Sequence, residues 1–355
     1  MSDSILTRMG DGERVKMLPS EIRDEILIGS ENAAEMARIP ALTHDEVDQL
    51  LDIIAEPGRV VSVPHGHELI VTDDGMAECF TGSEADGCSG ISMGRHASVL
   101  AYERALAADT SSIGHSDYSF KPVKAVLEVE LQTYHQLSLL TTAPMFYGSQ
   151  PNMGQYFQPD GPFPNPVALM PSGKIKEAQA AQEEAAAQLC DDMVFIGKEL
   201  NAMGCEGLNF DTAGSTGDAE FYATLEAARQ LKEHDPNMAI IIGMASEFVL
   251  GMHGEIAFEG QQLAGLFPHD QVKMAESVGA DIFGPAINVD TSKSFPWNLA
   301  KALTMVKETV VRADIPVHPN VGMGVCGIPM LLQVPIDCVS RASKALALIG
   351  KADGL

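Results

Sequence analysis

Basic residues are scarce in this sequence. Its 23 lysines and arginines are outnumbered by 49 aspartates and glutamates, giving a formal net charge of −26 at pH 7. Nucleic acids and anionic membranes are bound through clustered Lys and Arg, so this balance argues against both as partners. The chain also lacks an apolar run of the ~20 residues that a membrane span needs. Its first residues lack the basic and apolar regions of a signal peptide. We therefore expect a cytoplasmic protein.

Recognisable metal-binding and disulfide patterns are missing as well. The six cysteines include no CxxC pair, so we expect reduced thiols. His65 and His67 could ligate a metal from one face of a strand, but no Cys, His or acidic partner stands at a typical spacing. No metal site is predicted. Hydrophobic residues make up 45% of the chain, which is enough for a full core.

Residues 1–85 read as an N-terminal extension made of a helix and a β-hairpin. Thr43 and Glu46 form a capping box that predicts a helix start, and the helix ends before Pro57. β-Branched runs over 59–63 and 68–72 flank a Pro-His-Gly-His segment, which predicts a hairpin.

Residues 86–355 show alternating strand and helix patterns. Helices are predicted over 94–108, 122–137, 176–203, 217–233, 269–278, 295–313 and 337–350. Apolar strands are predicted over 137–147, 207–211, 239–245, 281–287 and 315–321. Such alternation indicates a parallel sheet covered by helices. Its regularity favours a (β/α)8 TIM-type barrel over an open doubly wound sheet. A proline-rich loop after the first of these strands is predicted to be a lid.

The last predicted helix ends in a junction that occurs three times. Glycine ends a helix, an acidic residue follows and a strand begins at Gly204, at Gly279 and again at Gly350. The first two copies continue as apolar strands, whereas the third stops at Leu355. The sequence thus predicts a barrel that is incomplete at its C-terminal end, cut off at the start of a late strand.

Polar residues directly follow several predicted strands, where the catalytic groups of βα barrels collect. These strand-end residues are Asp211, Glu247, Asn288, His318 and Asn320. For any single one of them a helix cap or a loop hydrogen bond is the favoured interpretation, and Asp211 and Glu247 are the strongest exceptions. Asp211 and Glu247 are the predicted catalytic residues, because a carboxylate at a deep mouth can hold an ammonium group or move a proton. Tyr147, Asn288, His318 and Asn320 are the predicted substrate-binding residues.

Several longer stretches are specific enough to suggest a family. They are RMGDG at 8–12, GHSDYSFKPVK at 114–124, YGSQPNMG at 147–154, NFDT at 209–212, GMHG at 251–254, FGP at 283–285 and NVGMG at 320–324. Together they resemble the dimethylamine:corrinoid methyltransferases of methylotrophic methanogens, and the similarity spans the whole chain.

The resemblance implies a TIM-type barrel that carries pyrrolysine, inserted at an in-frame amber codon. In that family Asp-Gly-Ile/Leu precedes the pyrrolysine, so Asp353, Gly354 and Leu355 would place it at the next position. This chain then corresponds to the amber-terminated form, which we expect to be inactive and, with unpaired barrel edges, prone to association. The family transfers a methyl group from dimethylamine to the Co(I) corrinoid of a cognate corrinoid protein, in methanogenesis from methylamines. Asp211 and Glu247 would supply and stabilise protons on the amine.

The resemblance further implies that the chain itself binds no cofactor, because the partner protein carries the corrinoid. A homo-oligomer is also expected. Two alternatives stay open from the residues alone. The first is a zinc-dependent corrinoid methyltransferase on a similar barrel, in which the metal acts as a Lewis acid. The second is a non-enzymatic truncated product that only docks the corrinoid protein.

Overall fold

A computed structural model describes residues 4–74, 110–114, 131, 145–148, 151, 153–251 and 254–355. The predicted helix 94–108 and most of the predicted helix 122–137 and of the predicted strand 137–147 lie outside these described residues. The strands are β1 (Ile5–Arg8), β2 (Arg14–Met17), β3 (Val71–Asp74), β4 (Thr110–Gly114), β5 (Met145–Gly148), β6 (Gly207–Phe210), β7 (Ala239–Ala245), β8 (Ala257–Phe258), β9 (Gln261–Gln262) and β10 (Ile282–Pro285).

The described helices are α1 (Pro19–Ala37), α2 (His44–Ala55), α5 (Pro166–Leu169), α6 (Ile175–Ala202), α7 (Asp218–His234), α8 (Pro268–Ser277), α9 (Phe295–Arg312) and α10 (Ile336–Ala345), with short 3-10 turns η3 (Met153–Tyr156) and η4 (Met170–Ser172) and a π-helical turn η5 (Leu346–Gly350). Helices α2 and α6 to α10 confirm predicted helices, whereas α1 and α5 were not predicted. No helix within the described part of the chain is both long and apolar enough to span a membrane.

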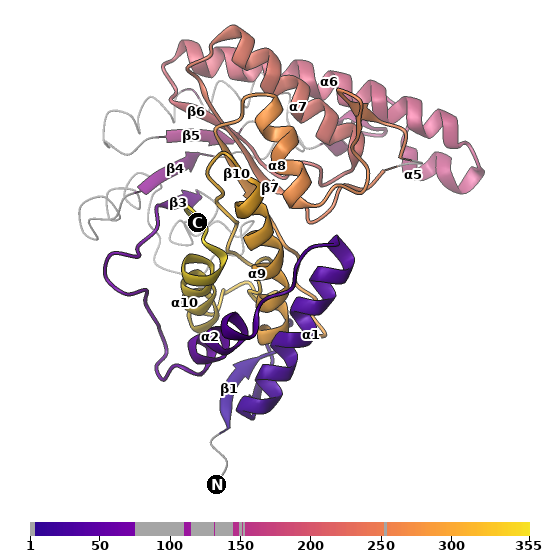
Figure 1. Cartoon of the computed structure of the whole chain (residues 1–355). Coiled ribbons are helices and arrows are strands. Elements are labelled where there is room, and N and C mark those ends of the chain that lie inside the picture. The colour runs from indigo at the N-terminus through magenta and orange to yellow at the C-terminus, as the bar shows by residue number, and fades with distance from the viewer. Residues whose placement is uncertain are drawn as a thin grey trace.

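The core of the fold is a six-stranded parallel sheet in the order β10-β7-β6-β5-β4-β3. Neighbours in this sheet are also consecutive along the chain, apart from the small β8–β9 hairpin. Helices α6, α7 and α8 stand between or beside its later strands (Figure 1). The mixed α/β class with a parallel sheet, predicted from the alternation, is therefore confirmed.

Residues 316–320 extend this hydrogen bonding beyond β10. The Phe283 N–H donates to the Pro316 carbonyl at 3.0 Å, and the His318 N–H returns a bond to the Phe283 carbonyl at 2.9 Å. The Asn320 N–H then donates to the Pro285 carbonyl at 3.0 Å. The predicted strand 315–321 is thus present as a short parallel bridge rather than a long strand.

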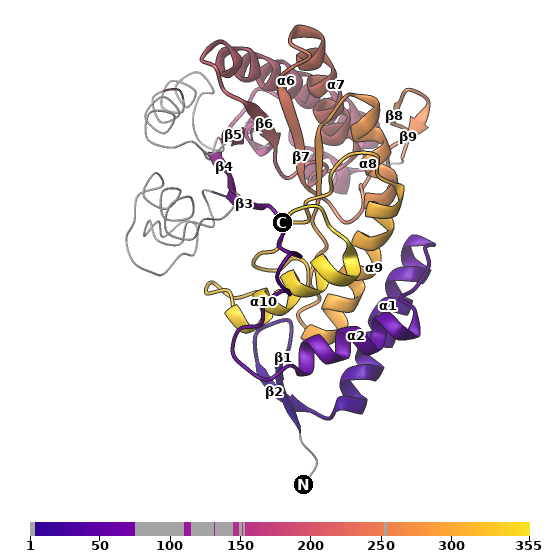
Figure 2. The same ribbon diagram turned by 60° about the vertical axis from the view of Figure 1, so that its left-hand side comes forward.

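The terminal residues connect this segment to the other end of the sheet. The Asp353 N–H donates to the Val317 carbonyl at 3.1 Å, and the Leu355 N–H donates to the Ile70 carbonyl at 3.0 Å. The Thr72 N–H donates to the Leu355 carbonyl at 2.7 Å. The C-terminus accordingly lies beside β3 in both views (Figure 1; Figure 2).

The prediction of an unpaired edge at the C-terminus is therefore wrong. The physical reason is the shortness of the strands: β3 and β6, for example, have only four residues each. Residues 353–355 are therefore enough to form hydrogen bonds to Val317 on one side and to Ile70 and Thr72 on the other. Because residues 353–355 are hydrogen-bonded on both sides, we no longer expect copies of the chain to associate through an unpaired edge here.

The two faces of the sheet have different character. Leu208 and Phe210 of β6 and Ile242 of β7 belong to the core packed with α6, α7 and α8. Side chains alternate between faces along a strand, so the intervening Asn209 and Ile241 point the other way. The sheet therefore presents its apolar face to the helices and a partly polar face opposite.

Helices α1, α2, α9 and α10 gather at the other end of the molecule (Figure 2). The capping box of Thr43 and Glu46 at the start of α2 is confirmed by reciprocal hydrogen bonds. Helix α1 packs along α9, where the Thr304 hydroxyl donates to the Ser30 hydroxyl at 2.9 Å.

The hairpin predicted over 59–72 is wrong, whereas a hairpin not predicted forms from β1 and β2. Residues 59–63 form no strand, and β3 joins the parallel sheet by pairing with β4. The β1–β2 turn lies in the RMGDG motif, where Gly12 adopts a φ of 92°. The division of the chain at residue 85 stays a prediction, and β3, which precedes it, is part of the sheet.

Four cysteines lie among the described residues, and all four are buried without a disulfide bond between them. Burial raises the pKa of Cys190, Cys326 and Cys338 to about 12. These thiols pack in the core and are not poised for nucleophilic chemistry.

Candidate functional site

The predicted strand-end residues gather at one edge of the sheet. Because the strands are parallel, the residues that follow them all lie at their carboxyl ends. Asp211 follows β6, Glu247 follows β7, Asn288 follows β10, and His318 and Asn320 follow the bridge at Val317. Tyr147 lies within β5, opposite Leu208 of β6, but its side chain lies outside the described part of the chain.

Asn209, one residue before the end of β6, brings a polar side chain to the face opposite the helices. It is only 3% exposed, and its Oδ1 has no hydrogen-bond partner within the described residues. The side chain lies against Gly243 of β7, where a Cβ would come within 2.3 Å of Asn209 Oδ1. Glycine at 243 thus provides the space that Asn209 fills. A buried acceptor without a partner is costly, so it is a candidate for binding a donor.

His318 occupies a similar position at the far end of the hydrogen-bonded ladder. Its ring lies over Gly354, where a Cβ would meet the imidazole Cε1 and Nε2 at 2.5 Å. His318 Nδ1 is buried and has no hydrogen-bond partner within the described residues. Burial lowers the pKa of His318, although the nearby Asp353 carboxylate opposes the shift. At neutral pH the imidazole is therefore uncharged, and one of its nitrogens can accept a hydrogen bond.

Asp211 supplies a carboxylate at the same edge. It is 8% exposed, and its Oδ1 accepts a bond from the Thr212 N–H at 2.7 Å. Thr212 adopts a φ of 58°, so the chain turns sharply at this point. By the alternation of side chains, Asp211 shares the face of Asn209 rather than that of Phe210.

Glu247 has a different environment from the one the sequence predicts. Its Oε1 forms an ion pair with Lys301 Nζ of α9 at 2.6 Å, and its Oε2 accepts a bond from the Asn288 N–H at 2.9 Å. Lys301 also donates to the Asn288 carbonyl at 3.3 Å. The Glu247 and Lys301 side chains are 4% and 10% exposed. Together they tie the loop after β7 to the loop after β10 and to α9.

Sequence reasoning missed Lys301 and the roles of Asn209 and Gly243. Each left a readable signal. Lys301 is the single charged residue between Phe295 and Val306 of α9, a stretch that is otherwise mostly apolar and buried, so an anionic partner is expected. Asn209 stands at an alternating position within an apolar strand, where a polar side chain must face away from the helices.

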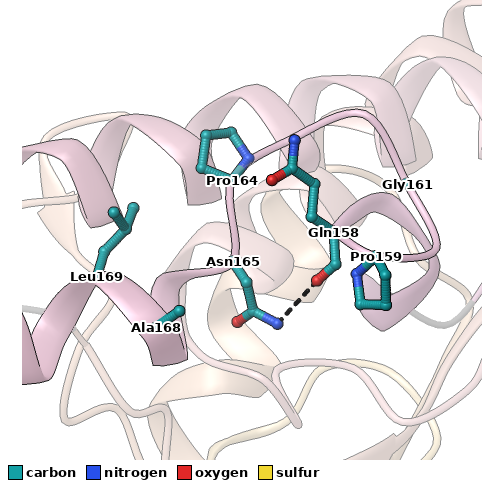
Figure 3. A pocket seen from close by; sticks show the side chains of 7 residues that line it. All are labelled: Gln158, Pro159, Gly161, Pro164, Asn165, Ala168 and Leu169. Carbon is teal, nitrogen blue, oxygen red and sulfur yellow. Dashed lines mark hydrogen bonds between the residues drawn. The ribbon is translucent and has the colours of Figure 1, made fainter.

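The proline-rich segment before α6 contains three short helical elements, η3, α5 and η4. The Tyr156 hydroxyl of η3 donates to Asp192 Oδ2 of α6 at 2.7 Å, which anchors the segment to that helix. A cavity of about 680 Å³ opens here (Figure 3). The Asn165 Nδ2 donates to the Gln158 carbonyl at 3.0 Å across it. Its lining residues include no ionisable side chain, so it offers no group for proton transfer. A lid role for this segment stays a prediction.

His65 and His67 lie exposed in an irregular segment rather than on a strand. The described part of the chain contains no cluster of three or more His, Cys, Asp or Glu side chains arranged to hold a metal ion.

Comparison with known proteins gives one match over nearly the whole chain. Residues 3–355 match the family described as dimethylamine methyltransferase. Two solved structures of the homocysteine methyltransferase MmuM from Escherichia coli are also similar. The apo form is 14% identical with a TM-score of 0.38, covering 78% of this chain and 95% of that chain. The metallated form is 15% identical with a TM-score of 0.36, covering 79% of this chain and 96% of that chain.

Proposed function

Because the chain belongs to the dimethylamine methyltransferase family, we propose that it takes part in methyl transfer from dimethylamine to the Co(I) corrinoid of a cognate corrinoid protein, with release of monomethylamine. The observation that carries the proposal is a pair of buried polar atoms, Asn209 Oδ1 and His318 Nδ1, that have no hydrogen-bond partner among the described residues and lie at the edge that also holds Asp211. A small alkylammonium ion offers the matching chemistry, with N–H donors, a positive charge and apolar methyl groups.

We further propose that the sheet is that of a (β/α)8 barrel. Six sequential parallel strands and two bridging segments, 316–320 and 353–355, are consistent with it. In such a barrel the carboxyl ends of the strands form the mouth where catalysis occurs. Asp211 and His318 would then lie around one opening, together with the predicted substrate-binding residues Tyr147, Asn288 and Asn320.

In this proposal each polar group has a separate role toward the amine. The Asp211 carboxylate balances the charge of the ammonium group. The neutral His318 imidazole and the Asn209 carbonyl accept its N–H donors and so orient a methyl group outward. The N–CH₃ bond breaks with its electron pair left on nitrogen, so a positively charged nitrogen makes the better leaving group. The corrinoid, which the partner carries, supplies the nucleophile that accepts the methyl group.

The direction of the chain at Leu355 is consistent with a pyrrolysine, as the resemblance implies, at the carboxyl edge of the sheet. Leu355 runs parallel to β3, so a following residue would continue toward the carboxyl ends of the strands. When present there, it supplies an electrophilic imine for the amine nitrogen.

Glu247 is better suited to a positioning role than to direct proton transfer. Both of its oxygens are engaged, by Lys301 and by the Asn288 N–H. Its ion pair fixes the loop after β10 and with it the backbone that leads to the site. The predicted catalytic role of Glu247 therefore becomes indirect in this proposal.

The test is methyl transfer to the Co(I) corrinoid protein, followed by the absorbance change of the cobalt centre, in the pyrrolysine-containing form. Asp211→Asn should lower kcat/KM by about 10- to 100-fold, the loss expected for a hydrogen bond to a charged group. The matched control is Asp314→Asn. Asp314 is an exposed carboxylate that pairs with Lys273 and lies just before the 316–320 segment, away from the carboxyl ends of the strands. Unchanged turnover in Asp211→Asn would remove Asp211 from the site, and unchanged turnover in Glu247→Gln would remove Glu247.

A further inference from the structure

A cleft of about 1060 Å³ lies between the β1–β2 hairpin, the residues that follow α2 and the start of α10. We call it the arginine cleft, because Arg8, Arg14, Arg59 and Arg341 line it. Asp337 is the one carboxylate among its lining residues. A local excess of positive charge stands out on a chain whose formal net charge is −26.

Two of these arginines are engaged within the protein. Arg8 forms a bidentate pair with Asp337, with Nε and Nη2 each 3.1 Å from a carboxylate oxygen. Arg341 donates instead to backbone carbonyls, at 3.1 Å to Ile54 and at 2.7 Å to Glu56. Those acceptors are neutral, so the positive charge of Arg341 is held in place without being cancelled.

The other two are available to a ligand. Arg14 and Arg59 are exposed and form no ion pair within the described residues. Large apolar side chains stand exposed beside them: Leu6 is 61% exposed, Leu332 69% and Ile336 44%. Guanidinium groups interleaved with exposed aliphatic side chains are typical of protein interfaces. The cleft also lies at the upper limit of the volumes found for small-molecule pockets.

The cleft lies on the same side of the molecule as the candidate site. Phe295 and Ile336, which line it, begin the helices that follow β10 and the 316–320 segment. Such helix starts lie at the carboxyl ends of the strands. The hairpin is fixed there by backbone bonds from the Gly10 N–H to the Lys293 carbonyl at 2.7 Å and from the Met330 N–H to the Gly10 carbonyl at 2.8 Å.

We propose that the arginine cleft docks an acidic segment, bearing large apolar side chains, of the protein that carries the methyl acceptor. This inference rests on the proposed function. A protein that receives a methyl group at the strand ends must approach this rim, and the free charges of Arg14 and Arg59 favour a partner surface of opposite sign. Complementary charge speeds association and selects the orientation of docking.

The experiment compares two doubly charge-reversed variants of the 355-residue chain. The test variant is Arg14→Glu with Arg59→Glu, and the control is Lys176→Glu with Lys198→Glu on α6, which has the same change in net charge. All four residues are exposed, so far-UV circular dichroism should stay unchanged in both variants. Affinity for the corrinoid protein is measured by calorimetry at low and moderate salt.

The test variant should bind at least tenfold more weakly and lose most of the salt dependence, whereas the control should stay within twofold of the unmodified chain. Equal affinity of the test variant, or an equal loss in the control, would overturn the docking site. Transfer to a free Co(I) corrinoid by the pyrrolysine-containing form needs no docking and reports on the proposed function separately. If that transfer fails, the proposed function fails. If it succeeds but the test variant still binds normally, only the cleft assignment fails.

Discussion

Replacing Lys301 by Met should destabilise the protein strongly, because it leaves the Glu247 carboxylate buried with one backbone donor. At the 2.6 Å separation of Nζ and Oε1, the Coulomb attraction is about 6 kcal/mol for an effective dielectric constant of about 20. Desolvation of both ions offsets most of this, so the net stabilisation by the pair is small. Removing Lys301 leaves the desolvation penalty of the Glu247 carboxylate without the compensating attraction. The free energy of unfolding should therefore fall by about 3 to 5 kcal/mol.

The assay is urea unfolding followed by tryptophan fluorescence. Trp297 is the chain's single tryptophan, is 6% exposed and lies about one turn before Lys301 in α9, so it reports on the affected helix. Glu247→Gln should cost less, about 1 to 3 kcal/mol, because the amide oxygen can still accept from Lys301. The double variant should be more stable than Lys301→Met, since no buried charge remains unpaired. If Lys301→Met unfolded at the same urea concentration as the unmodified chain, the buried pair would not exist as described.

Three further outcomes follow from the site and the core. Gly243→Ala should cost about 1 to 3 kcal/mol of unfolding free energy in the same assay, because its Cβ would approach Asn209 Oδ1 to 2.3 Å. Gly350→Ala, whose Cβ would meet only ordinary contacts at 3.5 Å or more, is the control and should be near neutral. Burial lowers the pKa of His318 in the folded state, so the unfolded chain binds more protons just below pH 6.5 and stability is lost as pH falls through that window. His318→Asn should therefore lose about 1 kcal/mol less between pH 7 and pH 5.5 than the unmodified chain, and an equal loss would contradict the assignment. Cys326, whose pKa burial raises to about 12, should resist iodoacetamide at pH 8 until urea unfolds the protein, as read by mass spectrometry.

The helices could be predicted from the sequence because their determinants are local. Helix α2 begins at the capping box of Thr43, and α6 and α9 show long apolar stripes whose bounds fall within a residue or two of the prediction. The strand β7 has the predicted bounds because it is a continuous apolar run buried on both faces. A segment that carries its own periodicity needs no knowledge of its partners.

Strand partners could not be predicted in the same way. The β-branched residues before Asp74 are consistent with any strand, and sequence proximity suggested a hairpin with 59–63. In the structure β3 pairs with β4, whose residues come far later in the chain. At the C-terminus, ignorance of the strand partners led to the opposite error, a strand that was missed. Three residues seem too few for a strand unless it is known that Val317 and Ile70 lie on either side of them.

The candidate site shows why strand-end positions are predictable while their electrostatics are not. Parallel topology alone places Asp211 and Glu247 at one edge, so their location follows from the order of strands. Whether a carboxylate there is available to a substrate depends on which cations the surrounding helices bring in. Lys301 comes from a helix more than fifty residues further along the chain and pairs with Glu247. In the proposed function this edge carries two acids with different roles: Glu247 fixes the loops, and Asp211 faces the amine.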